Sequence, residues 1–518
     1  MLLYPQILYH YHTLRNMPIN RYYNDLVSIH LCKKSTYIRS FEEWTLLQPI
    51  RQGYLWIQNT VHLFAQWFTA LLEGKVQKNN IAALDGVRAI ACLSVVAFHI
   101  SLVTRQDIHI WNPDYVNPLI SAIALSGDTG VTLFFILSGF LLFLPYAKTL
   151  LFEHAQWPSI RRFYLRRVLR IIPAYYITLF LMVLLYRPEY RHLDHLRNWG
   201  FFLTLFMDSS QSTYKSINGP FWTLAVEWQF YLLLPILAIG MGLLVRRGSL
   251  ARRLRTLLLC LGGLIVWGIG TRYAGLYLNA HPSATFLLPR PVLNYILPFI
   301  YGASGNGTHG KFLEDFAIGM LLSTAYILAR NLPAGNILQT RLRQFAPWLL
   351  AGALLWLLLM VMWKYNQANL QSPLHPWPFF DHLASIYDSV GEFGFAIGYG
   401  LFVAATLFGA AWLKRPFEWA PLRWIGFISF GIYMWHLLLL ESFTELVMVH
   451  LHNLSHLLQY SLYWGWLLVF IIPCALALYL LVEKPFMNLG HKPQRPTHEE
   501  TSSESTLTEK RVALARHD

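Results

Sequence analysis

Apolar runs long enough to cross a bilayer recur along most of this 518-residue chain. A transmembrane helix needs about 20 apolar residues, and inside lipid its backbone groups must be paired within the segment. Hydrophobic residues make up 55% of the chain and charged residues only 13%, which excludes an ordinary soluble protein of this length. The runs therefore predict an all-α, polytopic transmembrane helix bundle with about ten spans, in which the lipid bilayer is the solvent.

The loop charges predict how these spans are oriented. We place the spans at residues 83–104, 130–147, 168–186, 222–245, 256–278, 312–330, 345–363, 391–413, 425–449 and 461–482. Basic residues cluster in the loop 148–167, in "VRRGSLARRLR" and in "RNLPAGNILQTRLRQ". All three loops lie on the inner side when both termini are cytoplasmic. The net charge of +14 is therefore a topology signal, and no nucleic-acid partner is expected.

The chain divides into three predicted parts. Residues 1–82 form a cytoplasmic extension, in which "GYLWIQNTVHLFAQWFTALLEG" is amphipathic and predicts an interfacial helix. Residues 83–487 form the membrane domain, and the polar residues 488–518 predict a disordered cytoplasmic tail. Within the domain, "NWGFFLTLFMD" (198–208) is too short to span and predicts an outer re-entrant or interfacial element.

The cysteines indicate no metal or disulfide chemistry. Cys32, Cys92, Cys260 and Cys474 are widely separated and have neither CxxC nor other metal-type spacing. We therefore expect neither a disulfide framework nor a zinc site, and no metal cofactor.

The first span, "LDGVRAIACLSVVAFH", carries charge where hydrocarbon makes charge costly. Arg88 and His99 are eleven positions apart, which places them on nearly one helix face, ~16 Å apart in depth. Such residues usually face a bundle interior or a water-filled path. Two structural alternatives stay open: Arg88 as a snorkelling anchor at the cytoplasmic rim, and His99 as a hydrogen-bonded packing residue. Asp85 fits a cap at the helix start better than a catalyst.

The fourth span contains "NGPFWTLAVEWQFYLLLP", in which Trp222 is a candidate substrate contact. Thr223, Glu227 and Tyr231 follow one another at four-residue spacing on one face. A carboxylate at this depth must be paired, protonated or solvated by a cavity. Glu227 lies at a depth close to that of His99, so we predict a hydrogen-bonded His–Glu couple; the alternative is a carboxylate that only ties two helices together.

Three further stretches contain candidate functional residues for which a purely structural role is also well supported. In "ISFGIYMWHLLLLE", Tyr433 and His436 are three residues apart near the middle of a span. "RRFYLRRVLRIIPAYY" places five arginines at a cytoplasmic entry; they suit donor phosphates, although positive-inside anchoring explains most of them. Ser138 in "FFILSGFLL" lacks the Gly-x-Ser-x-Gly turn of a hydrolase nucleophile, and with its neighbouring glycine it favours close helix packing.

Taken in order, these stretches resemble the acyltransferase 3 family of integral membrane acyltransferases. "LDGVRAIACLSVVAFH" is similar to the family's opening Arg-x10-His motif. "GVTLFFILSGFLL", "RRVLRIIPAYY", "WTLAVEWQFYLLLP", "SFGIYMWH" and "VEKP" follow in the family's order, so the resemblance covers about residues 80–487. It implies a bundle of about ten helices that transfers an acyl group, commonly acetyl from acetyl-CoA, to a hydroxyl of a cell-surface or lipid-linked glycan.

The resemblance also implies roles for individual residues. Arg88 and His99 match the functional pair of the first span. The other matches are Arg167, Arg170, Glu227, Tyr231, His436 and Glu483. The chain departs from the family at Thr132, where relatives often carry Asp, and Asp128 is the nearest carboxylate in sequence.

These observations combine into one functional hypothesis with one rival. Arg88 and the arginines near 161–170 would hold the phosphates of an acyl-CoA, while His99 would act as general base on an acceptor hydroxyl, oriented by Glu227. The expected location is the bacterial inner membrane, with the donor inside and a glycan acceptor outside. The rival is a transporter or flippase, because intramembrane charges also mark transport paths; inverted repeats, which would support it, are not evident.

Overall fold

The computed structural model describes residues 60, 63, 65–72, 81–106, 118–152, 155–245, 248–281, 283–284, 289–302, 310–331, 337–368, 378–451 and 453–490. The chain divides into two compact units, Met1–Phe68 and Thr69–Asp518, and the helices below belong to the second. Most of the predicted extension and of the predicted tail lies outside the described residues. The three predicted parts therefore stay predictions.

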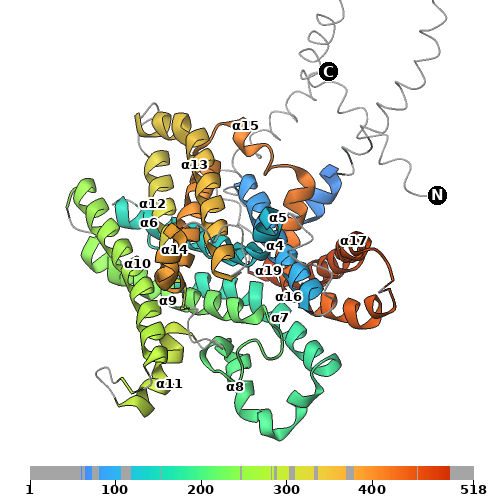
Figure 1. Ribbon diagram of the computed structural model, residues 1–518. Coiled ribbons are helices and arrows are strands. Elements are labelled where there is room, and N and C mark those ends of the chain that lie inside the picture. Colours follow the sequence, from blue (N-terminus) through green and yellow to red (C-terminus); the bar gives the residue numbers. More distant parts are fainter. Residues whose placement is uncertain are drawn as a thin grey trace, which may run out of the picture. The chain divides into compact units, whose positions relative to one another are not determined.

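Every regular element in the described ranges is helical (Figure 1). Nine helical segments there are long and apolar enough to cross a membrane, which confirms the polytopic bundle. These segments are α4 (Ala82–Gln106), α5 with α6 (Pro118–Leu125, Gly130–Leu151), α7 (Ile160–Leu185), α9 (Phe221–Val245), α10 (Leu250–Ala280), α13 (Ile337–Ala368), α14 (Pro378–Phe408), α16 (Ala420–Leu446) and the run α17–α19 (His456–Trp466, Ile472–Leu478, Lys484–Leu489).

The predicted span 312–330 forms a helix of a different character. It is α12 (Leu313–Asn331), which begins with Glu314 and Asp315 and ends near Arg330, and it is not among the nine apolar segments. It packs against α6, α10 and α14. Because other helices surround α12, protein groups instead of lipid meet its buried carboxylates.

Short elements connect the long helices. The 9-residue α8 (Leu196–Thr204) occupies the stretch predicted not to span, and it ends at Leu205 in a left-handed conformation, φ 57°. The other short elements are η4 (Gly127–Thr129), η5 (Pro188–Arg191), η6 (Leu193–His195), η7 (Met207–Ser209), α11 (Arg290–Tyr301), α15 (Ala411–Lys414), η8 (Met448–His450) and the π-helical turns η9 (Leu467–Ile471) and η10 (Tyr479–Glu483).

Two close helix crossings position the site. A Cβ on Gly426 of α16 would collide with the backbone carbonyl of Asp85 on α4, and one on Gly139 of α6 would collide with that of Phe316 on α12. Small residues at such crossings let backbones approach. The packing role predicted for Gly139 is therefore confirmed. Helices α4 and α16, far apart in sequence, lie side by side (Figure 1).

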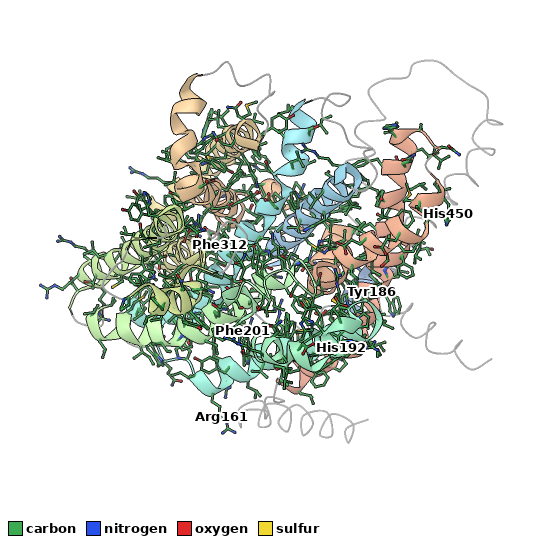
Figure 2. The ribbon with its side chains drawn as sticks, turned by 60° about the horizontal axis from the view of Figure 1, so that its bottom comes forward. Arg161, Tyr186, His192, Phe201, Phe312 and His450 are labelled. Carbon is green, nitrogen blue, oxygen red and sulfur yellow. The ribbon has the colours of Figure 1, made fainter. Side chains whose placement is uncertain are left out.

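The outer helices present apolar side chains at the periphery. Val266 and Trp267 of α10 are 71% and 60% exposed, and Trp348 of α13 is 75% exposed. Such surfaces suit lipid. Figure 2 shows the contrast between bundle and rim: Phe312 lies among the helices, whereas the exposed Arg161 at the start of α7 projects away from them.

Candidate active site

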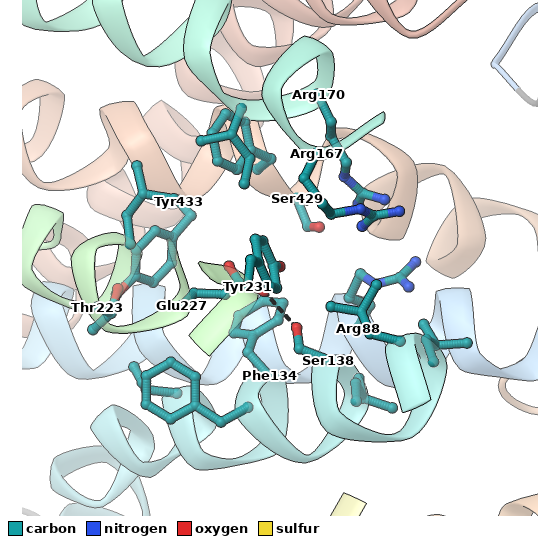
Figure 3. Close-up of a pocket in the computed structure, with 18 residues that line it drawn as sticks. Arg88, Phe134, Ser138, Arg167, Arg170, Thr223, Glu227, Tyr231, Ser429 and Tyr433 are labelled. Carbon is teal, nitrogen blue, oxygen red and sulfur yellow. Dashed lines mark hydrogen bonds between the residues drawn. The ribbon is translucent and has the colours of Figure 1, made fainter. Parts of the chain in front are cut away.

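A pocket of about 850 Å³, including its open mouth, lies between α4, α6, α7, α9 and α16. Its polar lining residues fall into three groups along its length (Figure 3). Arginines stand at one end, tyrosine and threonine hydroxyls at the other, and a carboxylate with its partners between them; the labelled residues are Arg88, Arg167, Arg170, Ser138, Glu227, Tyr231, Ser429, Thr223 and Tyr433. Large apolar side chains, among them Phe134, Phe135 and Phe430, fill the wall.

The arginine end is strongly basic. Arg167 and Arg170 lie about two and three turns into α7. The start of α7 is capped by the Ser159 hydroxyl, which accepts from the Arg162 backbone N–H at 3.4 Å. Arg88 enters from α4, and its charge interacts with that of Arg170. Three cations and one carboxylate, Glu227, line the pocket, so its net charge is positive and suits an anionic ligand.

Asp85 is the partner of Arg88 and not a helix cap. The Arg88 guanidinium bonds the Asp85 carboxylate at 3.1 Å, and Arg423 of α16 approaches the same carboxylate at 3.8 Å. Asp85 lies in the first turn of α4, after the helix has begun at Ala82. The predicted cap is therefore wrong: Asp85 orients Arg88 and links α4 to α16.

The carboxylate group in the middle of the pocket joins two helices. Glu227 of α9 accepts hydrogen bonds from Ser138 of α6 and from Tyr231, one turn along α9. The Arg167 guanidinium lies over the Tyr231 ring, 5.9 Å from its centroid. The predicted face of Glu227 and Tyr231 is thus turned into the pocket, and Ser138, expected to serve packing, makes a polar contact there.

The other end of the pocket is a hydroxyl pair. Thr223 donates to the Pro220 carbonyl at 2.9 Å, so its oxygen accepts from the Tyr433 hydroxyl at 2.6 Å. The Tyr433 ring packs edge-on against Phe134, with centroids 6.0 Å apart. It also contacts the His436 ring, with centroids 5.7 Å apart. Tyr433 is therefore the link between the pocket and the histidines.

Two histidines from α4 and α16 form a pair directly behind Tyr433. Nε2 of His436 lies 3.1 Å from Nδ1 of His99, although the residues are 337 positions apart. Nδ1 of His99 also contacts the Val95 carbonyl at 2.9 Å, and Nδ1 of His436 contacts the carbonyls of Ile432 and Tyr433 at 3.1 and 2.9 Å.

These contacts fix the tautomers, because carbonyl oxygens only accept. Both Nδ1 atoms must therefore carry the hydrogen, and His436 accepts through Nε2 from His99. The hydrogen bonds of the described residues leave Nε2 of the half-buried His99 with a free lone pair. An imidazole held this way can take a proton from a bound hydroxyl.

The predicted His99–Glu227 hydrogen bond is wrong. His99 pairs with His436, and Glu227 pairs with Ser138 and Tyr231. Similar depth in the membrane does not bring His99 and Glu227 into contact. Which sides of their helices face each other depends on how α4, α6, α9 and α16 pack. The structure therefore has two separate hydrogen-bonded groups where the sequence predicted one.

Two other candidates lie beside the pocket instead of lining it. Trp222 stacks near Phe312 and Tyr214, with ring centroids 5.6 and 6.3 Å away. Glu483 is buried on η10, where its charge interacts with that of Arg170. Neither is among the pocket-lining residues, and neither are His99 and His436.

The surroundings of His99 contain charges that the sequence analysis did not assign. Asp128 and Lys215 act on His99 electrostatically, and Asp128 pairs with Lys364 at 2.5 Å. Burial lowers the pKa of Lys215, and Asp128 opposes this effect. Thr132, where an acidic residue was expected, donates to Glu392 at 3.4 Å. Carboxylates near this position therefore come from α14 and, through Asp315, from α12, which no local pattern in the sequence indicates.

A second buried charged group, which we call the Arg272 cluster, consists of Arg272, Glu314, Asp315 and Glu392. Arg272 and Glu314 are 1% and 0% exposed, respectively, and form an ion pair. The Arg272 guanidinium also lies 5.0 Å from the Phe312 ring centroid. Asp315 and Glu392 interact electrostatically with this pair. None of the four lines the pocket.

Comparison with known proteins places this arrangement in a family. A model described as an acyltransferase domain matches residues 81–481, which is most of the chain. The chain belongs to the acyltransferase 3 family. The resemblance drawn from its motifs is thereby confirmed, and the pocket lies wholly within the matched residues.

The curated relatives of this family member are named as O-acetyltransferases. One is a Bacillus subtilis protein named "Putative peptidoglycan O-acetyltransferase", 26% identical over 80% of this chain and 56% of its own length. Another is the peptidoglycan O-acetyltransferase OatA of Listeria monocytogenes, 24% identical over 70% of this chain and 50% of its own length. The chain thus spans about half the length of these relatives. No solved structure matches it.

Proposed function

We propose that this acyltransferase 3 family member is a membrane-embedded O-acyltransferase. It moves an acyl group, acetyl in the simplest case, from acyl-CoA to a hydroxyl of a cell-surface or lipid-linked carbohydrate. One observation carries the proposal: a single pocket runs from three arginines to Tyr433, directly behind which stands the His99–His436 pair. A cationic end for a donor and a base near the other end are what acyl transfer between two substrates needs.

The arginine end is assigned to the donor. Guanidinium groups bind phosphate through paired N–H donors, and coenzyme A carries several phosphates. Arg167 and Arg170 would hold them, while Arg88, fixed by Asp85, faces the same space. With the nucleotide there, the pantetheine arm would reach past Glu227 and carry the thioester along the apolar wall.

The histidine end is assigned to the acceptor. His99 would remove the hydroxyl proton through Nε2 as the oxygen attacks the acyl carbonyl carbon, and the proton would end on the atom from which the acyl group departs. His436 does not touch the substrate in this scheme; it positions His99 by fixing its tautomer. The names of the relatives support a glycan as the acceptor, and peptidoglycan is the first one to test.

The loop charges supply the proposed sidedness. With both termini cytoplasmic, Arg88 lies near the inner face of a bacterial inner membrane and His99 lies in its outer half. The donor would then enter from the cytoplasm and the acceptor from outside.

Oriented proteoliposomes test this proposal. Acetyl-CoA labelled on the acetyl group is given on the cytoplasmic side, and a peptidoglycan fragment or a lipid-linked sugar on the other. We expect ester-linked label on the glycan and free CoA on the cytoplasmic side. Acylation only with donor and acceptor on one face would overturn the sidedness. Acylation from a phosphate-bearing acyl donor other than CoA would overturn the donor assignment.

The rival function, transport without chemistry, predicts a different result in the same vesicles. Label would cross the membrane as intact substrate, and no thioester would be cleaved. Movement of label without CoA release in the wild-type protein would end the transferase proposal.

A further inference from the structure

The hydroxyl of Ser138 behaves unlike those of other helical serines in the bundle. A serine inside a helix usually donates to the carbonyl one turn earlier. Ser94, Ser101 and Ser442 do so, donating to the carbonyls of Ile90, Ala97 and Leu438 at 2.8–2.9 Å. Ser138 donates instead across the helix interface to Glu227, and it does so at the wall of the pocket. A hydroxyl held on a carboxylate is the arrangement in which a base can activate a nucleophile.

Glu227 is a base that has no hydrogen bond to either histidine of the pair. Its two hydrogen-bond donors are Ser138 and Tyr231, whereas His99 is bonded to His436 and Val95. Thr223 lies one helical turn from Glu227, ~6 Å along α9, and belongs to the histidine end. There are thus two separate bases: Glu227 in the pocket wall, and His99 in the histidine pair behind Tyr433.

Two separate bases suit two half-reactions. We infer that Ser138 accepts the acyl group from the donor and carries it as a covalent ester before transfer to the acceptor; this inference rests on the function proposed above. In the first half-reaction the Ser138 oxygen attacks the thioester carbonyl, its C–O bond forms and the C–S bond breaks. Glu227 takes the hydroxyl proton and passes it to the departing thiolate, which leaves as the free thiol.

The second half-reaction restores the serine. The acceptor oxygen attacks the ester carbon, its bond to the acyl carbon forms, and the bond from that carbon to the Ser138 oxygen breaks. His99 takes the proton of the acceptor hydroxyl, and that proton ends on the serine oxygen. The products are the O-acylated acceptor and the original enzyme. No oxidant, reductant or metal enters either step.

Tyr231 is the competing nucleophile because it donates to the same carboxylate. Its side chain is only 5% exposed, and the Arg167 guanidinium covers its ring. Ser138 is half-buried, and its side chain at the pocket wall is smaller than that of Tyr231, which leaves more room for a bound acyl group. The geometry therefore favours Ser138, and Tyr231 is a residue that the test must separate from it.

Acid-quenched labelling tests the inference directly. Purified full-length protein in lipid nanodiscs is mixed with labelled acetyl-CoA in the absence of acceptor, quenched in acid, digested and analysed by mass spectrometry. We expect the acetyl group on the peptide that contains Ser138, together with a burst of free CoA equal to the amount of enzyme. Adding the glycan acceptor should remove the label.

Ser442 provides the matched control. It is a helical serine of α16 that is not among the pocket-lining residues, and its hydroxyl donates to the Leu438 carbonyl at 2.8 Å. Ser138→Ala should lose both the label and transfer, whereas Ser442→Ala should keep both. Ser138→Cys should restore labelling as a thioester that neutral hydroxylamine cleaves, which shows that loss in the alanine variant does not come from misfolding. Tyr231→Phe should keep the label.

The outcomes separate this inference from the proposed function. Wild-type transfer without label on Ser138, together with an active Ser138→Ala variant, would overturn the inference and leave the function standing. Label on Tyr231 or His99 would also overturn it. A wild-type protein that neither transfers acyl groups nor releases CoA would overturn both.

Discussion

The pocket and the Arg272 cluster both place charged groups inside the helix bundle, but none of the four cluster residues lines the pocket. The pocket is lined by three arginines and one carboxylate. The Arg272 cluster reverses this balance, with one arginine and three carboxylates, and its central ion pair is almost completely buried. Both clusters draw residues from several helices.

The difference shows that buried charge alone does not mark an active site. The ion pair of the Arg272 cluster is almost completely buried and joins α10 to α12, so we assign it a structural role. In the pocket, the Arg88 side chain is 18% exposed, Arg167 and Arg170 are half-buried, and all three line space that an anion can enter. Substitutions in the pocket region should therefore impair function, and those in the Arg272 cluster should impair stability.

The largest expected effect is that of His99→Ala. Removing the proposed base should lower acyl transfer by roughly 10²- to 10⁴-fold, because proton removal by a positioned base contributes about that much. The protein should still insert and elute normally on size-exclusion chromatography. Initial rates of ester formation in proteoliposomes provide the measurement. Wild-type rates in this variant would remove His99 from the chemistry.

Arg272→Leu should act on stability instead. It leaves Glu314 buried without its partner, which costs about 3–5 kcal/mol in comparable cases. Thermal unfolding in detergent should show a lower midpoint and less monodisperse protein. Arg161→Gln, at an exposed arginine, is the control and should have no effect. An Arg272→Leu protein that is as stable as the wild type but inactive would contradict this assignment and would show that the Arg272 cluster acts in function.

Arg167→Gln should weaken donor binding while the fold survives. Losing hydrogen bonds to a charged group costs about 1.5–3 kcal/mol, or roughly 10- to 100-fold in affinity. Wild-type affinity for acetyl-CoA should also fall as salt rises. Calorimetric titration measures both effects. Arg162→Gln, an exposed arginine of the same run, is the matched control, and equal losses in both variants would return Arg167 to a role in topology.

Tyr433→Phe should have the smallest effect. It tests whether the Tyr433 hydroxyl or only its ring connects the pocket to the histidines. The change removes the hydroxyl that donates to Thr223 and keeps the ring contacts with His436 and Phe134. One neutral hydrogen bond is worth about 0.5–1.5 kcal/mol, so kcat should fall by no more than about tenfold. A loss as large as that of His99→Ala would place the phenol itself in the reaction.

Much of the fold follows from the sequence because the constraints are local. Apolar runs of spanning length set the membrane helices, as α4 and α9 illustrate. The exception, α12, begins with two buried carboxylates that a protein environment tolerates better than lipid, and its hydropathy does not reveal which helices surround it. Of the three residues on which the sequence hypothesis rested, Arg88 and Glu227 line the pocket, whereas His99 pairs with His436 behind Tyr433.

The sequence by itself determined which residues share a helix face, because the α-helix has a fixed rise and rotation per residue. Arg88 with His99, and Thr223 with Glu227, follow from that geometry alone. Only the tertiary structure decided which faces meet. Ser138 reaches Glu227 across 89 positions and His436 reaches His99 across 337. Contacts of this kind depend on the angle and closeness of helix crossings, which the packing of many side chains sets together and no local pattern encodes.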